Sequence, residues 1–285
     1  MSKTILVPTD FSQGAENALN YAVVLAKKEN AGITLLHSFH PVYVSSDIPT
    51  KKIADEMMNE QKSIKQILAA MCKNITQVKK VQCDSICKQG FAVDVILDTI
   101  KEKKPQLVVM GTKGASGLKE IIIGSNTAKV IEKAQCPVIA VPQNSVCNGI
   151  KKITYATDYL TSDITDLKKI IEIAQPFKAE ITLLHASDAE YTPDADELLM
   201  RNFKNMISKK IDYNKLIFKI SHGKYLEKVL QEHIKSEKPD LIAMSTLHRD
   251  LFDRLFGTSA TKKMAYHSQI PLLAFHHKHE SVIFI

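Results

Sequence analysis

The sequence predicts an α/β fold made of two tandem, doubly wound parallel sheets of five strands each, Rossmann-like, with helices on both faces. Short apolar runs alternate with helical patterns along the chain, as is typical of a parallel sheet that is covered on both faces. The 285 residues are enough for two domains of ordinary size. The segment Ile33–His37 recurs letter for letter as Ile181–His185, at an offset of 148 residues. Such a repeat indicates that one domain has been duplicated.

Two further matches set the domain boundaries. Thr9–Phe11 corresponds to Thr157–Tyr159 at the same offset, whereas Lys104–Met110 corresponds to Lys238–Met244 at an offset of 134. The second copy has therefore lost about 14 residues after its second strand. We expect one domain over residues 1–142, a largely polar linker over residues 142–149, a second domain over residues 151–276 and a short tail over residues 277–285.

The elements of the first copy follow from local patterns. The expected strands are Thr4–Pro8, Ile33–Phe39, Val81–Lys88, Leu107–Met110 and Val138–Val141. A first helix begins after Ser12, whose hydroxyl suits an N-cap. Its apolar stripe keeps its register in both copies, as Leu19, Ala22, Val23 and Ala26 and then as Leu167, Ile170, Ile171 and Ala174. Further helices are expected over Lys52–Cys72, from Gly90 to Lys103 and after Gly124, and Lys151–Ala156 begins the second copy.

Composition narrows the function classes. Hydrophobic residues make up 45% and charged residues 24%, which is ordinary for a globular protein. The apolar runs are far shorter than the roughly 20 residues of a membrane span, and the N-terminus lacks the apolar length of a signal peptide. We therefore expect a cytoplasmic protein with no membrane partner. The net charge of +7 could indicate nucleic acid, but the lysines are scattered, so we expect a solvated basic surface instead.

The five cysteines contain no Cys-x2-Cys pair, and their odd number suits a reducing compartment. Cys83 and Cys87 lie four residues apart in an expected strand, where both would face the same side of the sheet. We interpret them as buried thiols in preference to a metal or redox site.

The segment Met110–Asn126 has the features of a phosphate-binding loop. It leaves an expected strand with Gly111 and Gly114, and a helix begins after Gly124. Glycine allows the backbone to turn with positive φ and lets a ligand approach without meeting a Cβ atom. The free N–H groups and the positive end of a helix attract anions. The segment therefore predicts a polyphosphate site.

In this segment the sequence resembles the ATP-binding branch of the universal stress protein family. Gly111, Gly114, Gly124 and Ser125 match the Gly-x2-Gly-x9-Gly-Ser/Thr signature of that branch. Three other segments fall in the family's order, namely Pro8–Asp10, Leu35–His37 and Cys136–Val141. The resemblance implies an adenine nucleotide alpha hydrolase-like fold that binds ATP, with Mg²⁺ as a companion ion still open. It also implies that the last strand mediates pairing, so that the copies could form an intramolecular pseudo-dimer, and the chain could form a homodimer as well.

The resemblance assigns residues to the nucleotide. It places Pro8, Thr9 and Met110 beside the ligand and gives Asp10 a contact with the nucleoside, where a carboxylate can accept from ribose hydroxyls or the adenine amine. Asp10 could instead cap the following helix. Ser38 stands where the family usually has an aliphatic residue against adenine, so the base preference stays open.

The phosphate end carries its own alternatives. Gly124, Ser125 and Asn126 are expected to donate to the polyphosphate, although Ser125 or Asn126 could act only as an N-cap. Lys113 could reach a phosphate as a mobile point charge or could be an exposed loop lysine.

The histidines carry no predicted chemistry. His37 and His185 occupy equivalent strand ends, and retention of the second in a copy without the glycine loop favours a structural role over catalysis. His276, His277 and His279 could bind zinc, but histidines at a terminus without a neighbouring cysteine are usually exposed. We therefore expect no catalytic and no metal-ligating residues.

The second copy has lost the glycine pattern. Ser245 and His248 replace the first two glycines, and the spacing to Gly257 is one residue shorter. Cβ atoms then stand where a phosphate chain would pass. Asp158 is retained although the rest of this site is broken. The sequence therefore predicts one nucleotide per chain, bound by the first copy.

The leading functional hypothesis is an ATP-binding regulatory or stress protein with slow or no hydrolysis. No Gly-x4-Gly-Lys-Ser/Thr motif supplies the usual phosphate lysine and magnesium hydroxyl. One alternative is a ligand-free interaction module of the same fold. Another is an adenine-nucleotide enzyme, such as an ATP pyrophosphatase or a nucleotidyltransferase. Those enzymes need a Ser-Gly-Gly loop or a His-x-Gly-His after the first strand, and Pro8–Ser12 offers neither.

Overall fold

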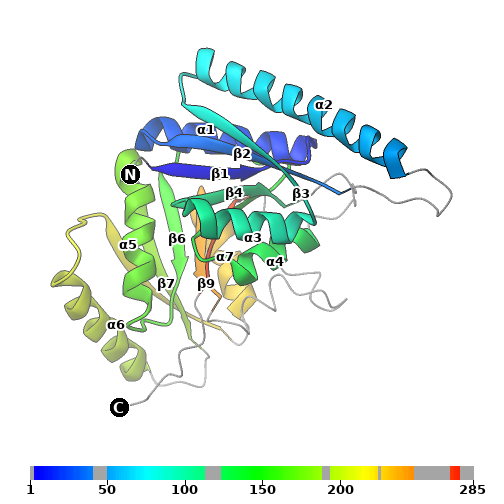
Figure 1. The fold of residues 1–285 in the computed structure, drawn as a ribbon. Helices are drawn as coiled ribbons and strands as arrows, with labels where there is room; N and C mark the ends of the chain where they lie inside the picture. Colours follow the sequence, from blue (N-terminus) through cyan, green and yellow to red (C-terminus); the bar gives the residue numbers. More distant parts are fainter. Residues whose placement is uncertain are drawn as a thin grey trace.

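The computed structural model describes residues 3–40, 50–112, 123–187, 193–223, 226–246 and 270–276. These residues form an α/β structure in which strands and helices alternate (Figure 1). The strands of the first half are β1 (Thr4–Pro8), β2 (Gly32–Phe39), β3 (Cys83–Gln89), β4 (Leu107–Gly111) and β5 (Val138–Val141). The strands of the second half are β6 (Lys152–Ala156), β7 (Glu180–Ser187), β8 (Leu216–His222), β9 (Leu241–Ser245) and β10 (Leu272–Phe275).

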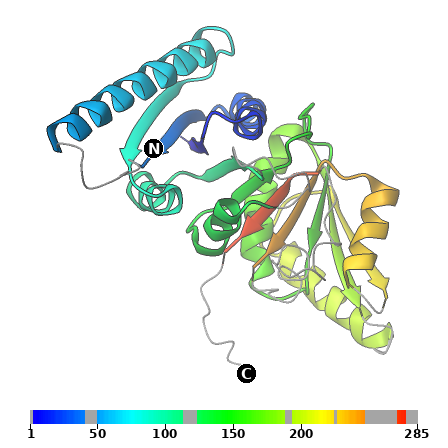
Figure 2. The same ribbon diagram turned by 90° about the vertical axis from the view of Figure 1, so that its right-hand side faces the viewer.

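All ten of these strands belong to one continuous sheet with the order β3-β2-β1-β4-β5-β10-β9-β6-β7-β8. Each half is parallel, and the halves join where β5 pairs antiparallel with β10. Ile139 of β5 lies opposite Leu273 of β10, and both side chains are fully buried. Figure 2 shows β10 (red) in the middle of the sheet, between the strands of the two halves. This is the internal pairing of last strands that the family resemblance implied.

Helices cover both faces of the sheet. They are α1 (Gln13–Glu29), α2 (Thr50–Gln77), α3 (Ala92–Lys103), α4 (Ser125–Lys133), α5 (Asp163–Ala174), the 3₁₀ helix η1 (Gln175–Phe177), α6 (Pro193–Ser208) and α7 (Leu226–Glu237). Buried residues of α1, α2, α5 and α6 share one core cluster, and those of α3, α4 and α7 share the other. Alternate residues of β1 point into these two layers, since Ile5 and Val7 belong to the first cluster and Leu6 to the second.

The first helix shows how the local sequence determines an element. The Ser12 hydroxyl accepts from the N–H of Ala15 and caps the helix. At the other end Asn30 adopts a left-handed conformation with φ of 53°, and its N–H donates to the carbonyl of Ala26. The predicted N-cap and apolar stripe are both confirmed, because Leu19 and its stripe partners are buried.

Several segments differ from the sequence expectation in their bounds or packing. Helix α3 begins at Ala92, two residues after the expected Gly90. Helix α2 begins two residues before the expected Lys52 and ends five residues after Cys72. Strand β3 begins at Cys83, two residues later than expected. The linker packs more closely than its polar composition suggested, because the side-chain amide of Asn17 donates to the carbonyls of Pro142 and Ser145.

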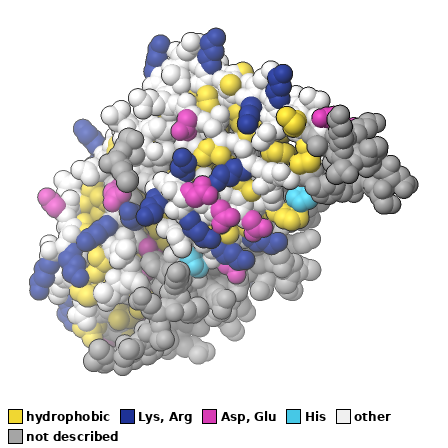
Figure 3. All heavy atoms as spheres, in the orientation of Figure 1, with side chains coloured by type: hydrophobic (Ala, Val, Ile, Leu, Met, Phe, Trp, Pro, Cys, Tyr) yellow, Lys and Arg dark blue, Asp and Glu magenta, His cyan; other side chains and the backbone are white. Residues whose placement is uncertain are grey.

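The surface agrees with the scattered charge of the sequence. On the face in Figure 3, lysine and arginine side chains are interspersed with aspartate and glutamate and form no single basic patch. Among the described residues, no helix combines the length and the apolar character needed to cross a membrane.

Candidate functional site

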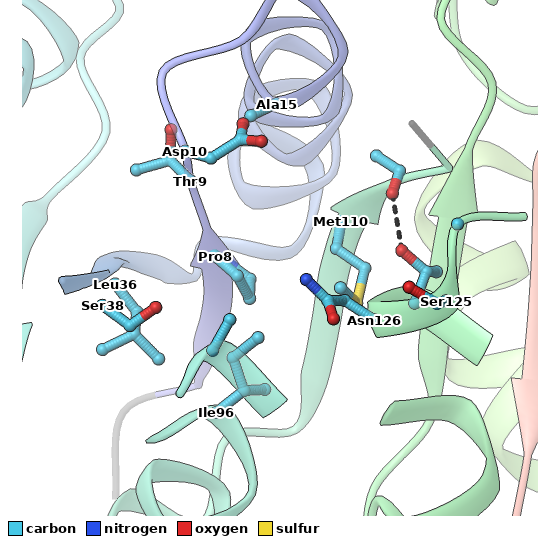
Figure 4. Close-up of a pocket in the computed structure, with 14 residues that line it drawn as sticks. Pro8, Thr9, Asp10, Ala15, Leu36, Ser38, Ile96, Met110, Ser125 and Asn126 are labelled. Carbon is cyan, nitrogen blue, oxygen red and sulfur yellow. Dashed lines mark hydrogen bonds between the residues drawn. The ribbon is translucent and has the colours of Figure 1, made fainter. Parts of the chain in front are cut away.

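A cavity of about 360 Å³ opens at the carboxyl ends of β1 and β4. Strand β1 pairs with β2 on one side and with β4 on the other, so the strand order reverses at this point. Ligands of doubly wound sheets bind at such positions. Figure 4 shows Pro8, Leu36 and Ser38 on one side of the cavity and Met110, Ser125 and Asn126 on the other.

Nine of the eleven predicted site residues line this cavity. They are Pro8, Thr9, Asp10, Ser38, Met110, Gly111, Gly124, Ser125 and Asn126. The other two, Lys113 and Gly114, lie outside the described residues. The cavity is also lined by residues that the sequence analysis did not single out, namely Ala15, Leu36, Ala92, Ile96 and Thr127.

The turn between β1 and α1 presents Asp10 to this cavity. One carboxylate oxygen of Asp10 accepts from the N–H and the hydroxyl of Ser12. The Thr9 hydroxyl accepts from the N–H of Phe11, which has a φ of 63°. Because Ser12 is the residue that caps α1, Asp10 supports the cap and is not itself the cap. The capping alternative for Asp10 is therefore replaced by a bracing role, which does not exclude contact with a ligand.

Gly111 allows β4 to end directly against the start of α1. A Cβ atom added at Gly111 would lie 2.8 Å from the carbonyl carbon and oxygen of Gly14 and 3.3 Å from the nitrogen of Ala15. Backbone atoms cannot yield at such distances without moving the helix. The requirement for glycine here is close approach, because Gly111 is absent from the residues with positive φ.

Gly124 serves the loop in a different way from the one predicted. Its N–H donates to the carbonyl of Thr112, which closes the loop, and is not directed at a ligand. A Cβ atom at Gly124 would lie 2.9 Å from that same carbonyl oxygen. The expectation that the Gly124 N–H donates to phosphate is therefore wrong for this conformation.

The first turn of α4 keeps the anion-binding features. Gly124 is its N-cap and supplies no side-chain cap hydrogen bond. Ser125 and Asn126 are exposed at this turn, and the Thr127 hydroxyl donates to the carbonyl of Gly111, which fixes the helix to β4. The N–H groups of a first helical turn have no intrahelical acceptors. This end of the cavity can therefore receive an anion.

The opposite side of the cavity is apolar. Leu36 and Ile96 line it and are nearly fully buried. Ser38 adds a hydroxyl at the edge of this wall. The arrangement suits a ligand with a flat apolar part and an anionic part, because each end of the cavity offers one kind of contact.

The strand-end histidines have structural contacts in both halves. His37 Nδ1 lies 2.8 Å from the carbonyl of Thr9, and His185 Nδ1 lies 2.9 Å from the carbonyl of Thr157. Phe11 stacks on His37 with ring centroids 4.5 Å apart. The repetition of one contact in both halves supports the structural interpretation.

The second half has a different chemistry at the matching edge. Asp163 stands at the position of Ala15 and is only 1% exposed. It accepts from the hydroxyl of Thr157 and from the N–H of Leu160. Leu160 stands at the position of the capping Ser12 and has no hydroxyl. The buried carboxylate of Asp163 accepts the hydrogen bonds that hold this turn instead. Ser245, at the position of Gly111, is also buried, whereas His248 and Gly257 lie outside the described residues.

A second buried carboxylate, Asp196 of α6, lies near two histidines. Asp196 is 3.9 Å from His185 Nε2 and 3.9 Å from His222 Nδ1. Burial and the charge of Asp196 raise the pKa of the neighbouring Tyr159, so this phenol remains protonated. Among the described residues, no group of three or more metal-ligating side chains could hold a metal ion. His277 and His279 of the tail lie outside the described residues.

Comparison with known proteins places the chain in a family. The model of the universal stress protein family matches residues 1–142 and again residues 149–276. The chain belongs to the universal stress protein family. The universal stress protein YxiE of Bacillus subtilis (strain 168) is 34% identical over 147 residues, which cover 50% of this chain and 99% of YxiE.

A solved structure agrees with the fold of this tandem universal stress protein. The crystal structure of a universal stress protein from Archaeoglobus fulgidus DSM 4304 covers 96% of this chain and 98% of its own, at 19% identity and a TM-score of 0.70. A universal stress protein solved in complex with cAMP covers 49% of this chain and 96% of its own, at 22% identity and a TM-score of 0.38. The first of these shows that the fold extends over both halves.

Proposed function

We propose that this protein is an ATP-binding regulatory universal stress protein that holds one nucleotide per chain in the first-half cavity. The observation that supports this most strongly is one cavity with an apolar wall on one side and, on the other, a helix N-terminus that has no side-chain cap. The adenine ring would lie against Leu36 and Ile96, and the phosphates would lie at the first turn of α4. Asp10 would accept from the ribose hydroxyls or the adenine amine.

The residues present fit a polyphosphate. A Cβ atom at Gly111 or at Gly124 would collide with neighbouring backbone, so glycine at both positions lets the chain pack closely beside the cavity. Lys113 and Gly114 would complete the loop.

Hydrolysis is expected to be slow or absent. Among the described residues that line the cavity, none corresponds to a general base with a phosphate lysine and a magnesium hydroxyl arranged as in fast nucleotide hydrolases. Bound ATP would then act through its differential affinity for two states of the protein or for a partner. This role is regulatory and is not that of an enzyme.

Calorimetric titration of ATP into the wild-type chain and two matched variants tests the proposal. Ser38→Trp places an indole in the cavity, whereas Ala186→Trp makes the same change at the equivalent position of β7. We expect wild type and Ala186→Trp to bind one equivalent, and Ser38→Trp to lose at least about tenfold in affinity, the size of a single lost or blocked contact of about 1.4 kcal/mol. AMP, ADP and cAMP in the same titration measure the nucleotide preference.

Other outcomes of the titration favour the alternatives. A wild-type chain that ignores every nucleotide favours the ligand-free interaction module. Rapid conversion of ATP to AMP and pyrophosphate favours the adenine-nucleotide enzyme. Two equivalents bound per chain would show that the second half retains a site.

A further inference from the structure

Two cysteine thiols meet between α2 and β3. Cys72 lies near the end of α2 and Cys83 is the first residue of β3. Their sulfur atoms are 3.2 Å apart, with the Cys83 thiol donating to Cys72. A disulfide has a sulfur separation of about 2.05 Å, so the pair needs to close by only about 1 Å. The sequence spacing paired Cys83 with Cys87, but in the structure the thiol of Cys83 contacts Cys72.

Packing alone does not explain this pair. The register of β2 with β3 places Cys83 opposite Ile33, and the register of β7 with β8 places Leu216 opposite Ile181. Leu216 is thus the second-half equivalent of Cys83, and it packs against the same core cluster. Since leucine fills the equivalent position in the duplicated half, the thiol of Cys83 offers a chemistry that the packing does not require.

The two thiols differ in access. Cys72 is buried, with 9% of its surface exposed, whereas Cys83 is only partly buried. A small oxidant from solvent would therefore reach Cys83 first. The Cys72 sulfur lies within contact distance to attack the oxidised product. This is the arrangement of a reacting thiol next to a resolving thiol.

We propose that Cys72 and Cys83 form a reversible oxidation site that closes to a disulfide when the protein meets a hydroperoxide. In the first step the Cys83 thiolate attacks a peroxide oxygen, the O–O bond breaks, and an alcohol or water leaves after taking up a proton. This step gives a sulfenic acid on Cys83. In the second step Cys72 attacks the Cys83 sulfur, the S–O bond breaks, and water leaves with the Cys72 proton. The two thiols lose two electrons, and the hydroperoxide is reduced.

The surroundings make the reaction slow at neutral pH. Burial raises the pKa of the Cys83 thiol strongly, and the neighbouring Cys72 and the Asp84 carboxylate raise this pKa further. Only the thiolate is nucleophilic, so the rate should rise about tenfold for each pH unit below the pKa. The pair therefore responds to a high or sustained oxidant load and not to a trace.

Closure would fasten α2 to the sheet. The disulfide would link the end of α2 to the start of β3 across the connection at residues 73–82. A disulfide that closes this short loop lowers the conformational entropy of the unfolded chain more than that of the folded chain. Oxidation should consequently raise the midpoint of thermal unfolding by a few degrees.

Peptide mapping of the full chain tests the proposal. The protein is treated with hydrogen peroxide at two pH values one unit apart, digested without reductant and analysed by mass spectrometry. We expect a cross-linked pair of peptides containing Cys72 and Cys83 that disappears with dithiothreitol and forms about tenfold faster at the higher pH. Cys83→Leu, which copies Leu216, should fold, should lose the cross-link and should lose the rise in the unfolding midpoint. Cys136→Ser should keep both.

The proposal is overturned by any of three results. One is a folded wild type that forms no Cys72–Cys83 link while other thiols oxidise. Another is the capture of Cys83 as a sulfinic acid or in a link to Cys87. The last is a midpoint shift that persists in Cys83→Leu. If that variant does not fold, Cys72→Ala provides the same comparison. None of these results depends on nucleotide binding.

Discussion

The two halves share a fold and a strand register but differ at their carboxyl edges. In each half the first strand is followed by Thr-Asp and an aromatic residue of positive φ, namely Phe11 and Tyr159. Each half also uses a histidine to hold that turn. The first half then leaves a cavity beside Ala15, whereas the second half places the buried carboxylate of Asp163 at the same position. The residues that the two halves share support the turn, and the residue that differs, Ala15 or Asp163, determines whether the edge could receive an anion.

This difference is electrostatic as much as steric. The glycine loop could be lost through Cβ atoms alone, as Ser245 at the position of Gly111 illustrates. Asp163 also places a carboxylate at the position that lines the cavity as Ala15 in the first half. Two separate changes therefore oppose a polyphosphate in the second half, and reversing one of them should not restore binding.

The largest effect is expected from transferring the carboxylate to the first half as Ala15→Asp. Ala15 lines the cavity, and its N–H donates to the Ser12 hydroxyl. As a general scale, two like charges about 5 Å apart repel by about 3 kcal/mol at an effective dielectric constant of about 20, which corresponds to about 100-fold in affinity. Calorimetric titration with ATP measures the loss.

Ala15→Asn is the matched control for size. It should lose much less affinity than Ala15→Asp, because the amide is neutral. Equal losses in the two variants would show that crowding, and not charge, separates the halves.

A smaller effect is expected when Asp163→Ala removes the carboxylate from the second half. The Thr157 hydroxyl and the Leu160 N–H then lose their acceptor. Leaving a buried donor unpaired costs about 1–3 kcal/mol. Urea denaturation should show this loss of stability, while ATP binding to the first half stays at the wild-type level. Unchanged or increased stability would indicate that the carboxylate is tolerated and does not support the turn.

The smallest effect is expected in how the stability of the protein depends on pH. His233 of α7 is buried, and its Nε2 lies 2.9 Å from the Thr154 hydroxyl. In the first half Thr99 stands at the position of His233, and Leu6 stands at the position of Thr154. Burial and then the charge of Lys219 lower the pKa of His233 below its usual 6.5. The unfolded chain then binds a proton more readily than the folded one, so stability is complete above the usual pKa and is lost as the pH falls below it.

Replacing this histidine by the first-half residue as His233→Thr should flatten that dependence. Each unit of pKa depression corresponds to about 1.4 kcal/mol, which sets the scale of the change. Urea denaturation of both proteins between about pH 7 and about pH 5 measures the slope. Identical slopes would mean that His233 does not distinguish the halves in acid.

Most of the fold could be predicted because its signals are local or repeated. Strand bounds such as Thr4–Pro8 and Val138–Val141 follow from short apolar runs and agree with the structure. The end of α2 could not be predicted, because its last turns are set by packing of Ile75 on the sheet and not by a terminating residue. The packing of the linker depends on Asn17, which lies more than a hundred residues away.

The candidate site was predicted as a location but not in its details. Glycine spacing and the Thr-Asp turn identified the cavity that the structure contains. The spacing could not show that Thr112 would occupy the N–H of Gly124, since that bond depends on how the loop closes. Thr127 could have been included, because its hydroxyl lies in the first turn of a helix that begins after a glycine.

The antiparallel joint between β5 and β10 has a consequence for assembly. Each of these strands is already hydrogen-bonded on both sides, β5 to β4 and β10 to β9. The backbone groups through which a one-domain relative could recruit a second copy are therefore consumed within the chain. Among the strands that the structure describes, the sheet terminates at β3 and β8, so a homodimer built by adding strands to this sheet would use those outer strands. Gene duplication has in this way moved the available association surface from the middle of the assembly to its two ends.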